Sequence, residues 1–324
     1  MRSVMWACAA LAASALSPHA MAASDLDRQD CNSDNPALMI RGCTRLIEDP
    51  GETTANRALA LYKRGLGYIT RGETDRAIAD YDEAIKLTPG NGLTFNERGI
   101  AYRAKGDFDR AIADFDQAIT LDSGNADIYY NRGHARLNRG EPDRAVADFD
   151  EAIKLGSKNV IAVTKDEEIT RLAAERINAD YYGARGHAEF LLSRFDAAAA
   201  DYGRFVRIFP DNPYTVLWLY LARARSGQQS GAAELQSNAA ALKPTDWPFP
   251  VVELFLGRRT AEATLAAASK PEERCEANYY VGEWYLLRGD GPAALAAHKG
   301  AADTCSKESD EYLLARGELR RPGK

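Results

Sequence analysis

Four cysteines beyond residue 22 are the first residues of this chain whose type could support chemistry. They are Cys31, Cys43, Cys275 and Cys305. An even number of cysteines in an exported chain favours disulfide bonds. The first pair would pin an N-terminal tail onto its own helix, and the second would join the start and the end of one helical hairpin. Their separations do not fit the clustered C-x-x-C pairs of zinc sites, and free buried thiols are the alternative.

Two histidines are the next candidates. His134 and His187 each follow a glycine in the same local pattern, but an inserted segment separates them, and a metal would require both within about 2 Å of one ion. The sequence contains no G-x-S-x-G, no H-E-x-x-H and no Gly-rich phosphate loop. We therefore predict no metal, no cofactor and no catalytic residue, which means that the chain is not an enzyme.

A pattern of about 34 residues, written three times between Ala58 and Asn159, must position these side chains. Each copy has a glycine, an alanine and an aromatic residue at fixed spacing: Gly65, Ala77 and Tyr81, then Gly99, Ala111 and Phe115, then Gly133, Ala145 and Phe149. The small residues let two helices approach, and the aromatic ring fills the wedge beside them. The pattern resembles the tetratricopeptide repeat (TPR). It predicts an all-α fold, a right-handed TPR superhelix (α-solenoid) of antiparallel helix pairs with the A helices on its concave wall.

The same pattern divides the chain into segments. We expect a signal peptide (1–22), an N-terminal tail and capping helix (23–57), TPR 1 (58–91), TPR 2 (92–125), TPR 3 (126–159), an inserted helix (160–178), TPR 4 (179–212), degenerate helical repeats (213–274), a TPR-like final unit (275–305) and a capping helix and tail (306–324). The inserted helix should lengthen the A helix that follows it. Charged residues from Lys307 to Lys324 predict that the last helix and the tail are solvated.

Charged residues recur once per repeat. Arginine stands at one position of helix A and aspartate at one position of helix B, in the pairs Arg64 and Asp80, Arg98 and Asp114, and Arg132 and Asp148. General acid–base catalysis would need paired carboxylates in one pocket. A spacing of one per repeat instead predicts a ladder of structural ion pairs.

The first 22 residues have the form of a secretory signal peptide. Arg2 precedes an apolar run from Val4 to Leu16, and Ala20-Met21-Ala22 predicts cleavage after Ala22. The run is shorter than the roughly 20 residues that span a bilayer, so we expect a periplasmic protein with no integral membrane segment after cleavage; a retained helix is the alternative. The net charge of −6 becomes about −7 without Arg2, which argues against nucleic acid as a partner.

The concave positions of the A helices are the candidate binding residues. This peptide-binding groove comprises Tyr62, Leu66, Asn96, Ile100, Arg103, Tyr130, His134, Asn138 and His187. Aromatic rings supply contact area, and amides can pair with an extended backbone. Tyr62 and Leu66 occupy the first two positions of the clamp with which other TPRs hold a C-terminal carboxylate, so that mode of binding is absent. Alternatively, these side chains merely cover the surface of a solenoid.

Two stretches carry a more specific resemblance. One contains Leu217-Trp218-Leu219-Tyr220-Leu221-Ala222 and Val252-Glu253-Leu254-Phe255-Leu256-Gly257, and the other runs from Tyr280 to Asp290. They resemble new lipoprotein I, a family of bacterial outer-membrane TPR lipoproteins that scaffold peptidoglycan hydrolases and a tail-specific protease. The lipidated cysteine of that family has no counterpart here. The resemblance implies a periplasmic scaffold.

The expected function follows from the repeats and this resemblance together. We expect a non-catalytic periplasmic TPR scaffold or adaptor that binds protein or peptide partners and recruits envelope hydrolases or proteases. The alternative is an assembly subunit of a secretion, pilus or polysaccharide export machine. A homodimer remains open.

Overall fold

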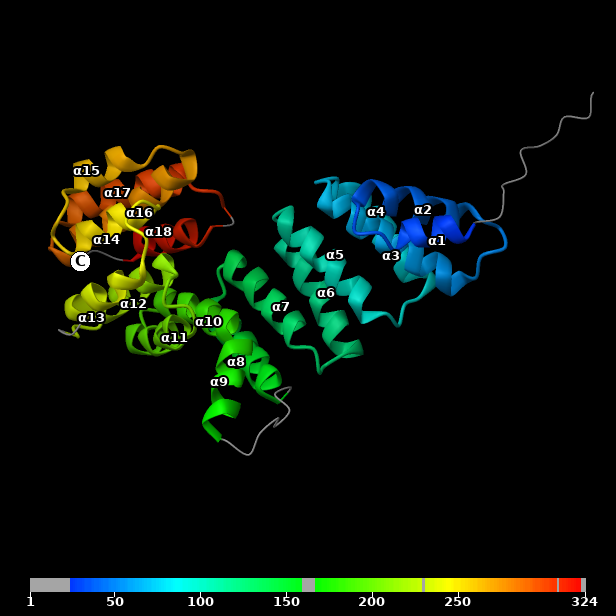
Figure 1. Cartoon of the computed structure of the whole chain (residues 1–324), viewed down its shortest axis with the longest axis horizontal. Coiled ribbons are helices and arrows are strands. Elements are labelled where there is room, and N and C mark those ends of the chain that lie inside the picture. The colour runs from blue at the N-terminus through cyan, green and yellow to red at the C-terminus, as the bar shows by residue number, and fades with distance from the viewer. Residues whose placement is uncertain (1–23, 159–166, 229–230, 308, 322–324) are drawn as a thin grey trace, which may run out of the picture. The chain divides into compact units, whose positions relative to one another are not determined.

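The computed structural model describes residues 24–158, 167–228, 231–307 and 309–321, and the predicted signal peptide lies outside these ranges. Every regular element in them is helical (Figure 1), which confirms the all-α class. The chain divides into two compact units, an N-terminal unit (Met1–Pro89) and a C-terminal unit (Gly90–Lys324). None of the described helices is long and apolar enough to cross a membrane.

The N-terminal unit consists of two helical hairpins. Its helices are α1 (Asp25–Cys31), α2 (Pro36–Glu48), α3 (Thr54–Thr70) and α4 (Thr74–Leu87). The sequence predicts a tail where α1 lies. A helix forms there because the Ser24 side chain accepts a hydrogen bond from the Asp27 N–H while the Asp27 carboxylate accepts one from the Ser24 N–H, which is a capping box.

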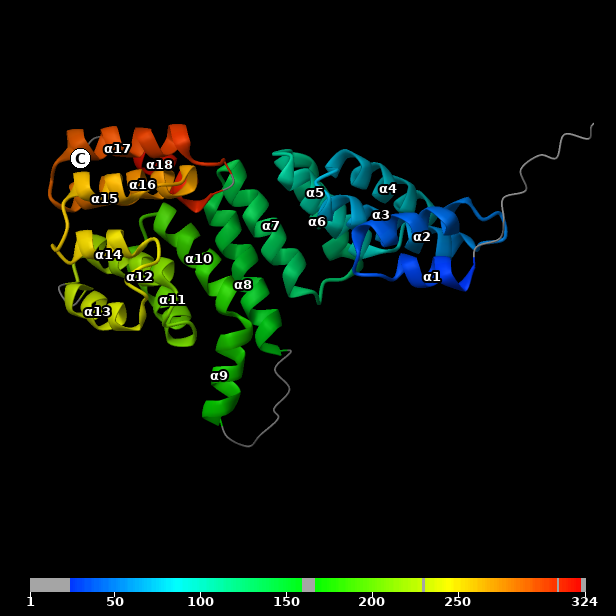
Figure 2. The ribbon, with the colours of Figure 1, turned by 45° about the horizontal axis from the view of Figure 1, so that its top comes forward.

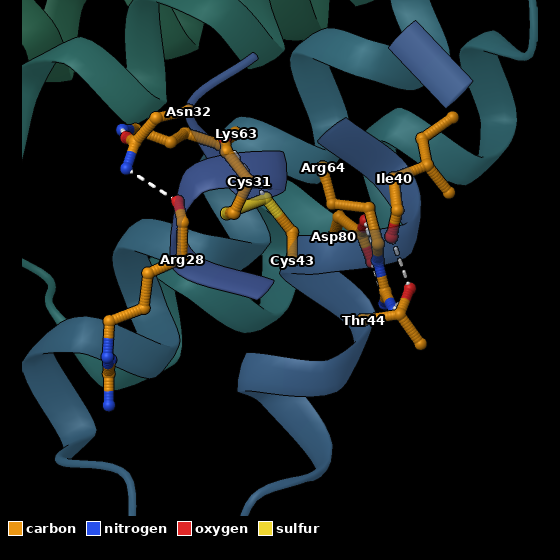
Figure 3. The surroundings of a disulfide bond; sticks show 9 residues. All are labelled: Arg28, Cys31, Asn32, Ile40, Cys43, Thr44, Lys63, Arg64 and Asp80. Atoms are coloured by element: carbon orange, nitrogen blue, oxygen red, sulfur yellow. Dashed lines mark hydrogen bonds and ion pairs between the residues drawn. A yellow bond between two sulfur atoms is a disulfide. The ribbon is translucent and has the colours of Figure 1, made fainter. Parts of the chain in front are cut away.

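A disulfide joins the two helices of the first hairpin (Figure 3). Cys31 ends α1, Cys43 lies in α2, and their Cα atoms are 4.6 Å apart. Gly42 makes this approach possible, because a Cβ at that position would lie 2.5 Å from the Cys31 backbone nitrogen. The bond therefore pins α1 onto α2 at the point where the two backbones are closest.

The C-terminal unit continues the hairpins in chain order (Figures 1 and 2). Its elements are α5 (Gly92–Ala104), α6 (Phe108–Leu121), α7 (Ala126–Arg139), α8 (Pro142–Lys158), α9 (Glu167–Ile177), α10 (Ala179–Leu191), α11 (Phe195–Ile208), α12 (Pro213–Arg225), α13 (Gly231–Asn238), the short 3₁₀ helix η1 (Ala239–Ala241), α14 (Phe249–Phe255), α15 (Ala261–Ala267), α16 (Pro271–Leu287), α17 (Gly291–Thr304) and α18 (Asp310–Arg320).

Each repeat hairpin closes on a glycine packed against an aromatic ring. A Cβ added to Gly99, Gly133 or Gly186 would lie between 2.5 and 2.8 Å from an atom of Phe115, Phe149 or Tyr202, respectively. Real Cβ contacts are never that short, so these glycines allow the close approach of helix A to helix B. Gly65 and Tyr81 make the same pair in the N-terminal unit.

The predicted ladder of ion pairs is confirmed. Arginine and aspartate pair at 2.6–2.7 Å in Arg64–Asp80, Arg98–Asp114, Arg132–Asp148 and, in the fourth repeat, Arg185–Asp201. Arg132 also reaches Asp116 of the preceding repeat, and Arg185 reaches Asp150 of the repeat before it, both at 2.6 Å. In the C-terminal unit the ladder therefore joins neighbouring repeats as well as the two helices of one hairpin.

The inserted segment does not interrupt the stack. Helix α9 runs almost directly into α10, because the Asn178 N–H donates to the Ala174 carbonyl while the Tyr182 N–H donates to the Asn178 carbonyl. Helix α10 nevertheless packs against α8 and α7, as the next repeat would without an insertion. The part of the insertion at residues 159–166 lies outside the described ranges.

The last helix is only partly solvated, which corrects the expectation from its charged residues: Arg316 and Arg320 are exposed, but one face is buried. The end of the predicted tail, at residues 322–324, lies outside the described ranges. Leu314 and Ala315 of α18 are 2% and 0% exposed and belong to a core that reaches back to Phe190 in α10. Arg225 of α12 binds Glu283 at 2.8 Å and Glu318 at 3.0 Å. Figure 2 shows α16, α17 and α18 side by side. Glu318 of α18 thus forms an ion pair with an earlier helix, and α18 packs back onto earlier repeats.

Candidate functional site

The predicted groove residues fall in both units. Tyr62 and Leu66 lie partly buried on α3 of the N-terminal unit, where the Tyr62 ring centroid is 6.2 Å from that of Tyr81. The other seven lie on α5, α7 and α10 of the C-terminal unit. Most of the predicted groove therefore belongs to the C-terminal unit.

The residues predicted on α5 are engaged with neighbouring side chains. Asn96 is only 7% exposed, and its carbonyl oxygen accepts a hydrogen bond from the Asn131 amide at 3.1 Å while its own amide donates to Glu97 at 3.2 Å. Ile100 and Arg103 are partly buried. Asn96 thus serves the contact between α5 and α7 rather than offering its amide to a peptide.

Three predicted residues come together at one pocket. Tyr130 and His134, one turn apart on α7, and His187 on α10 line a cavity of about 330 Å³. We call it the aromatic pocket; its other side chains include Tyr202 and Phe205 of α11, Tyr214 and Trp218 of α12, Asp180 of α10, Glu276 of α16, and Asp310 and Glu311 of α18.

The rings of the aromatic pocket pack edge to face. Tyr130 and His134 have ring centroids 4.5 Å apart at 81°, and His187 lies 5.1 Å from the Trp218 ring at 69°. Such T-shaped pairs are the favoured arrangement of aromatic rings. They hold the histidines in place and leave both near the carboxylates of α18.

The charges in this pocket are strongly coupled. His187 Nδ1 lies 3.1 Å from Asp310 Oδ2. Burial lowers the pKa of His187, but attraction to Asp310 outweighs it and the pKa is raised above its ordinary value. Within the described residues no carboxylate forms an ion pair with His134, and burial lowers the pKa of His134 to about 4. Burial, with the neighbouring Asp310 carboxylate, raises the pKa of Glu311 to about 7. At neutral pH, therefore, His134 is neutral and Glu311 is about half ionised.

Much of this pocket could not be predicted from the sequence. We expected the insertion to keep His134 and His187 apart, which is wrong, because α10 stacks on α7 and α8. Glu276 and Glu311 come from helices far along the chain and follow no period. Tyr202 gave no signal of its own, since repeat 1 also has a tyrosine, Tyr81, at this position. Among the described residues, no group of three or more His, Cys, Asp or Glu side chains is placed to hold a metal ion.

Asn138, the remaining predicted residue, lines a second cavity of about 720 Å³. Its charged lining residues are all cationic: Lys105, Arg139, Lys307, Arg316 and Arg320. Arg139 is neutralised by Asp109 at 2.7 Å and by Glu141 at 2.5 Å. The two cavities lie against the same helix, α18, and carry opposite charge.

Comparison with known families decides what the repeats are. Residues 58–91 and 126–159 match the tetratricopeptide repeat family, and residues 99–140 match the TPR repeat. The chain is a tetratricopeptide repeat protein. TPR proteins are generally non-catalytic scaffolds for other proteins.

Solved TPR structures resemble this one. The C-terminal part of a TPR repeat-containing protein from Cytophaga hutchinsonii is 17% identical, with 88% of this chain and 96% of that one covered and a TM-score of 0.51. YrrB, a TPR protein with an unusual peptide-binding site, is 17% identical over 64% of this chain and 94% of its own, with a TM-score of 0.49. PilW, a type IV pilus biogenesis factor, is 16% identical over 80% and 98%, with a TM-score of 0.48. At 17% identity, the likeness to the Cytophaga protein concerns the fold alone.

Proposed function

We propose that this TPR protein is a non-catalytic adaptor of the periplasm that binds a segment of a partner protein in the aromatic pocket. The observation that supports it is the convergence of Tyr130, His134 and His187, all from A helices, on one cavity lined by further aromatic rings. Aromatic side chains in a concave pocket are the usual anchors of peptide and protein binding.

The periplasmic part of the proposal rests on independent features. The first 22 residues have the form of a signal peptide, and the cysteines that follow them form two disulfides, which persist in oxidising compartments. The resemblance to new lipoprotein I favours envelope hydrolases or proteases as partners.

Capture from a periplasmic extract tests the proposal. The mature chain, immobilised, should retain a defined set of proteins. Tyr130→Ala should reduce this retention, because removing an aromatic anchor usually costs about 2 kcal/mol of binding free energy. The matched control is Tyr129→Ala, which removes the ring of the adjacent residue of α7; Tyr129 is likewise partly buried but does not line the pocket.

The outcome also separates the two candidate roles. Captured hydrolases or proteases favour the scaffold, whereas subunits of a secretion, pilus or polysaccharide export machine favour the assembly role. If Tyr130→Ala is folded and retains every partner as well as the wild type does, the aromatic pocket is not the binding site.

A further inference from the structure

The aromatic pocket carries an excess of negative charge. Four of its lining residues are acidic, namely Asp180, Glu276, Asp310 and Glu311, and none is lysine or arginine. His187 balances Asp310, and Glu276 accepts hydrogen bonds from neutral groups, including Trp247 Nε1 at 2.6 Å. Even with His187 protonated, the cationic side chains that line the pocket fall short of its carboxylates.

Among these carboxylates, Glu311 is the one for which the lack of cationic side chains matters most. It is 8% exposed, and within the described residues no lysine or arginine forms an ion pair with it. A buried carboxylate without a counter-charge is costly to ionise. Its raised pKa expresses the same cost. A positive charge brought into the pocket would remove this penalty.

A second observation, independent of the acidic groups, concerns Tyr202. Its side chain is 1% exposed, it lines the pocket, and its hydroxyl has no hydrogen-bond partner in the described part of the chain. Phe115 and Phe149 fill the same position in two other repeats and pack on glycine in the same way. The hydroxyl is therefore not required for packing, and it leaves at the pocket an unpaired polar group that can donate and accept, which is unfavourable unless a ligand pairs with it.

The aromatic walls suit the same kind of ligand. The rings of Tyr130, Tyr214 and Trp218 line the pocket together with those of Tyr202 and Phe205. Aromatic faces attract cations, most strongly where water is excluded. Carboxylates, an unpaired hydroxyl and aromatic rings around one small cavity thus all favour an organic cation.

We infer that the aromatic pocket binds one cationic side chain, lysine or arginine, of the partner segment. This inference rests on the proposed function, because it names the chemistry recognised at that site. The cavity volume of about 330 Å³ is at the small end for ligand pockets, which suits a single side chain rather than a folded surface. An ammonium or guanidinium group would donate to Glu311 and to the Tyr202 hydroxyl, and its alkyl stem would lie against the rings.

Short peptides test the charge directly. The probes are acetylated and amidated pentapeptides with alanine at four positions and lysine, arginine or norleucine at the centre. Norleucine keeps the alkyl chain of lysine and lacks its charge. In calorimetric titration of the mature chain, a cationic peptide should bind at least about tenfold more tightly than the norleucine peptide.

Two conservative variants locate the effect. Glu311→Gln and Tyr202→Phe should each lower the affinity for the tighter-binding cationic peptide by about threefold or more. Tyr202→Phe keeps the fold because Phe115 and Phe149 occupy the equivalent positions. The matched controls are Glu272→Gln, which removes the same charge from an exposed position of α16, and Tyr81→Phe, which removes a hydroxyl from the N-terminal unit; both should bind like the wild type.

Several results would overturn the inference. They are equal affinity for the norleucine and cationic peptides, no binding of either cationic peptide below about 10 mM, or unchanged affinity in both pocket variants. Failure of the proposed function looks different, since it is seen as partner retention that does not depend on Tyr130. If retention depends on Tyr130 and the peptides show no preference for charge, the adaptor role stands and the cation specificity is wrong.

Discussion

The disulfide between Cys275 and Cys305 allows a quantitative prediction. It joins the first turns of α16 to the C-cap of α17 across 30 residues, with Cα atoms 4.8 Å apart. Closing a loop of that length removes chain entropy worth about 3.6 kcal/mol at 25 °C in the unfolded state. The double variant Cys275→Ala/Cys305→Ala should lose about this much stability of the final hairpin. Hydrogen exchange in α16 and α17 should accelerate by up to about 400-fold, because each 1.36 kcal/mol is a factor of ten.

Hydrogen exchange read by mass spectrometry, with urea unfolding in parallel, checks the prediction. Helix α18 should loosen together with α16 and α17 because it packs on both. The matched control is Cys31→Ala/Cys43→Ala, whose 12-residue loop is worth about 2.8 kcal/mol and whose effect should stay in α1 and α2. Equal exchange in wild type and variant, acceleration spread evenly to α5–α8, or free thiols in the exported protein would refute the reasoning.

Two further predictions concern buried charges. Arg225→Met should destabilise the C-terminal unit by up to about 3–5 kcal/mol in urea unfolding, because Glu283 and Glu318 lose the arginine that they share and keep His298 and Arg321, respectively, as partners. Adding Glu283→Gln and Glu318→Gln should recover most of the loss, and no recovery would contradict a charge effect. Affinity for the cationic peptide should rise from pH 6 to pH 8 by up to about ninefold, because a Glu311 pKa of about 7 changes its ionised fraction from about 10% to 90%. His187, whose pKa is raised, loses its proton in the same direction and adds to the rise, so Glu311→Gln should reduce the pH dependence, and an affinity that falls with pH would contradict the assignment.

The repeating part of the fold could be predicted from the sequence because its determinants are local and periodic. A glycine and an aromatic residue 16 positions apart, as in Gly133 and Phe149, specify one close helix contact wherever they recur. The arginine and aspartate of the ladder have the same separation, as in Arg132 and Asp148. A rule read from three copies therefore also holds in the fourth, where Arg185 binds Asp201.

The remainder of the fold depends on contacts between residues that do not recur with the period of the repeats. Arg225 meets Glu283 and Glu318, which are 58 and 93 residues further along the chain. The charged sequence of α18 predicts a solvated helix because its few apolar residues, such as Leu314, are outnumbered, yet those few are the ones that pack. The aromatic pocket was only partly predictable for the same reason, since Glu311 reaches it through the return of α18.

The return of α18 fixes how many repeats this part of the array can hold. Solenoids usually grow by duplicating a unit, since each repeat touches only its neighbours. Here Arg321 donates to the Phe190 carbonyl at 3.1 Å, and Gly317 brings the backbone of α18 against the Leu191 side chain. A hairpin duplicated between α10 and α16 would move these partners apart and break the shared core. The stretch from α10 to α18 is therefore an indivisible piece of the protein, and changes of length by duplication are compatible only with hairpins outside it.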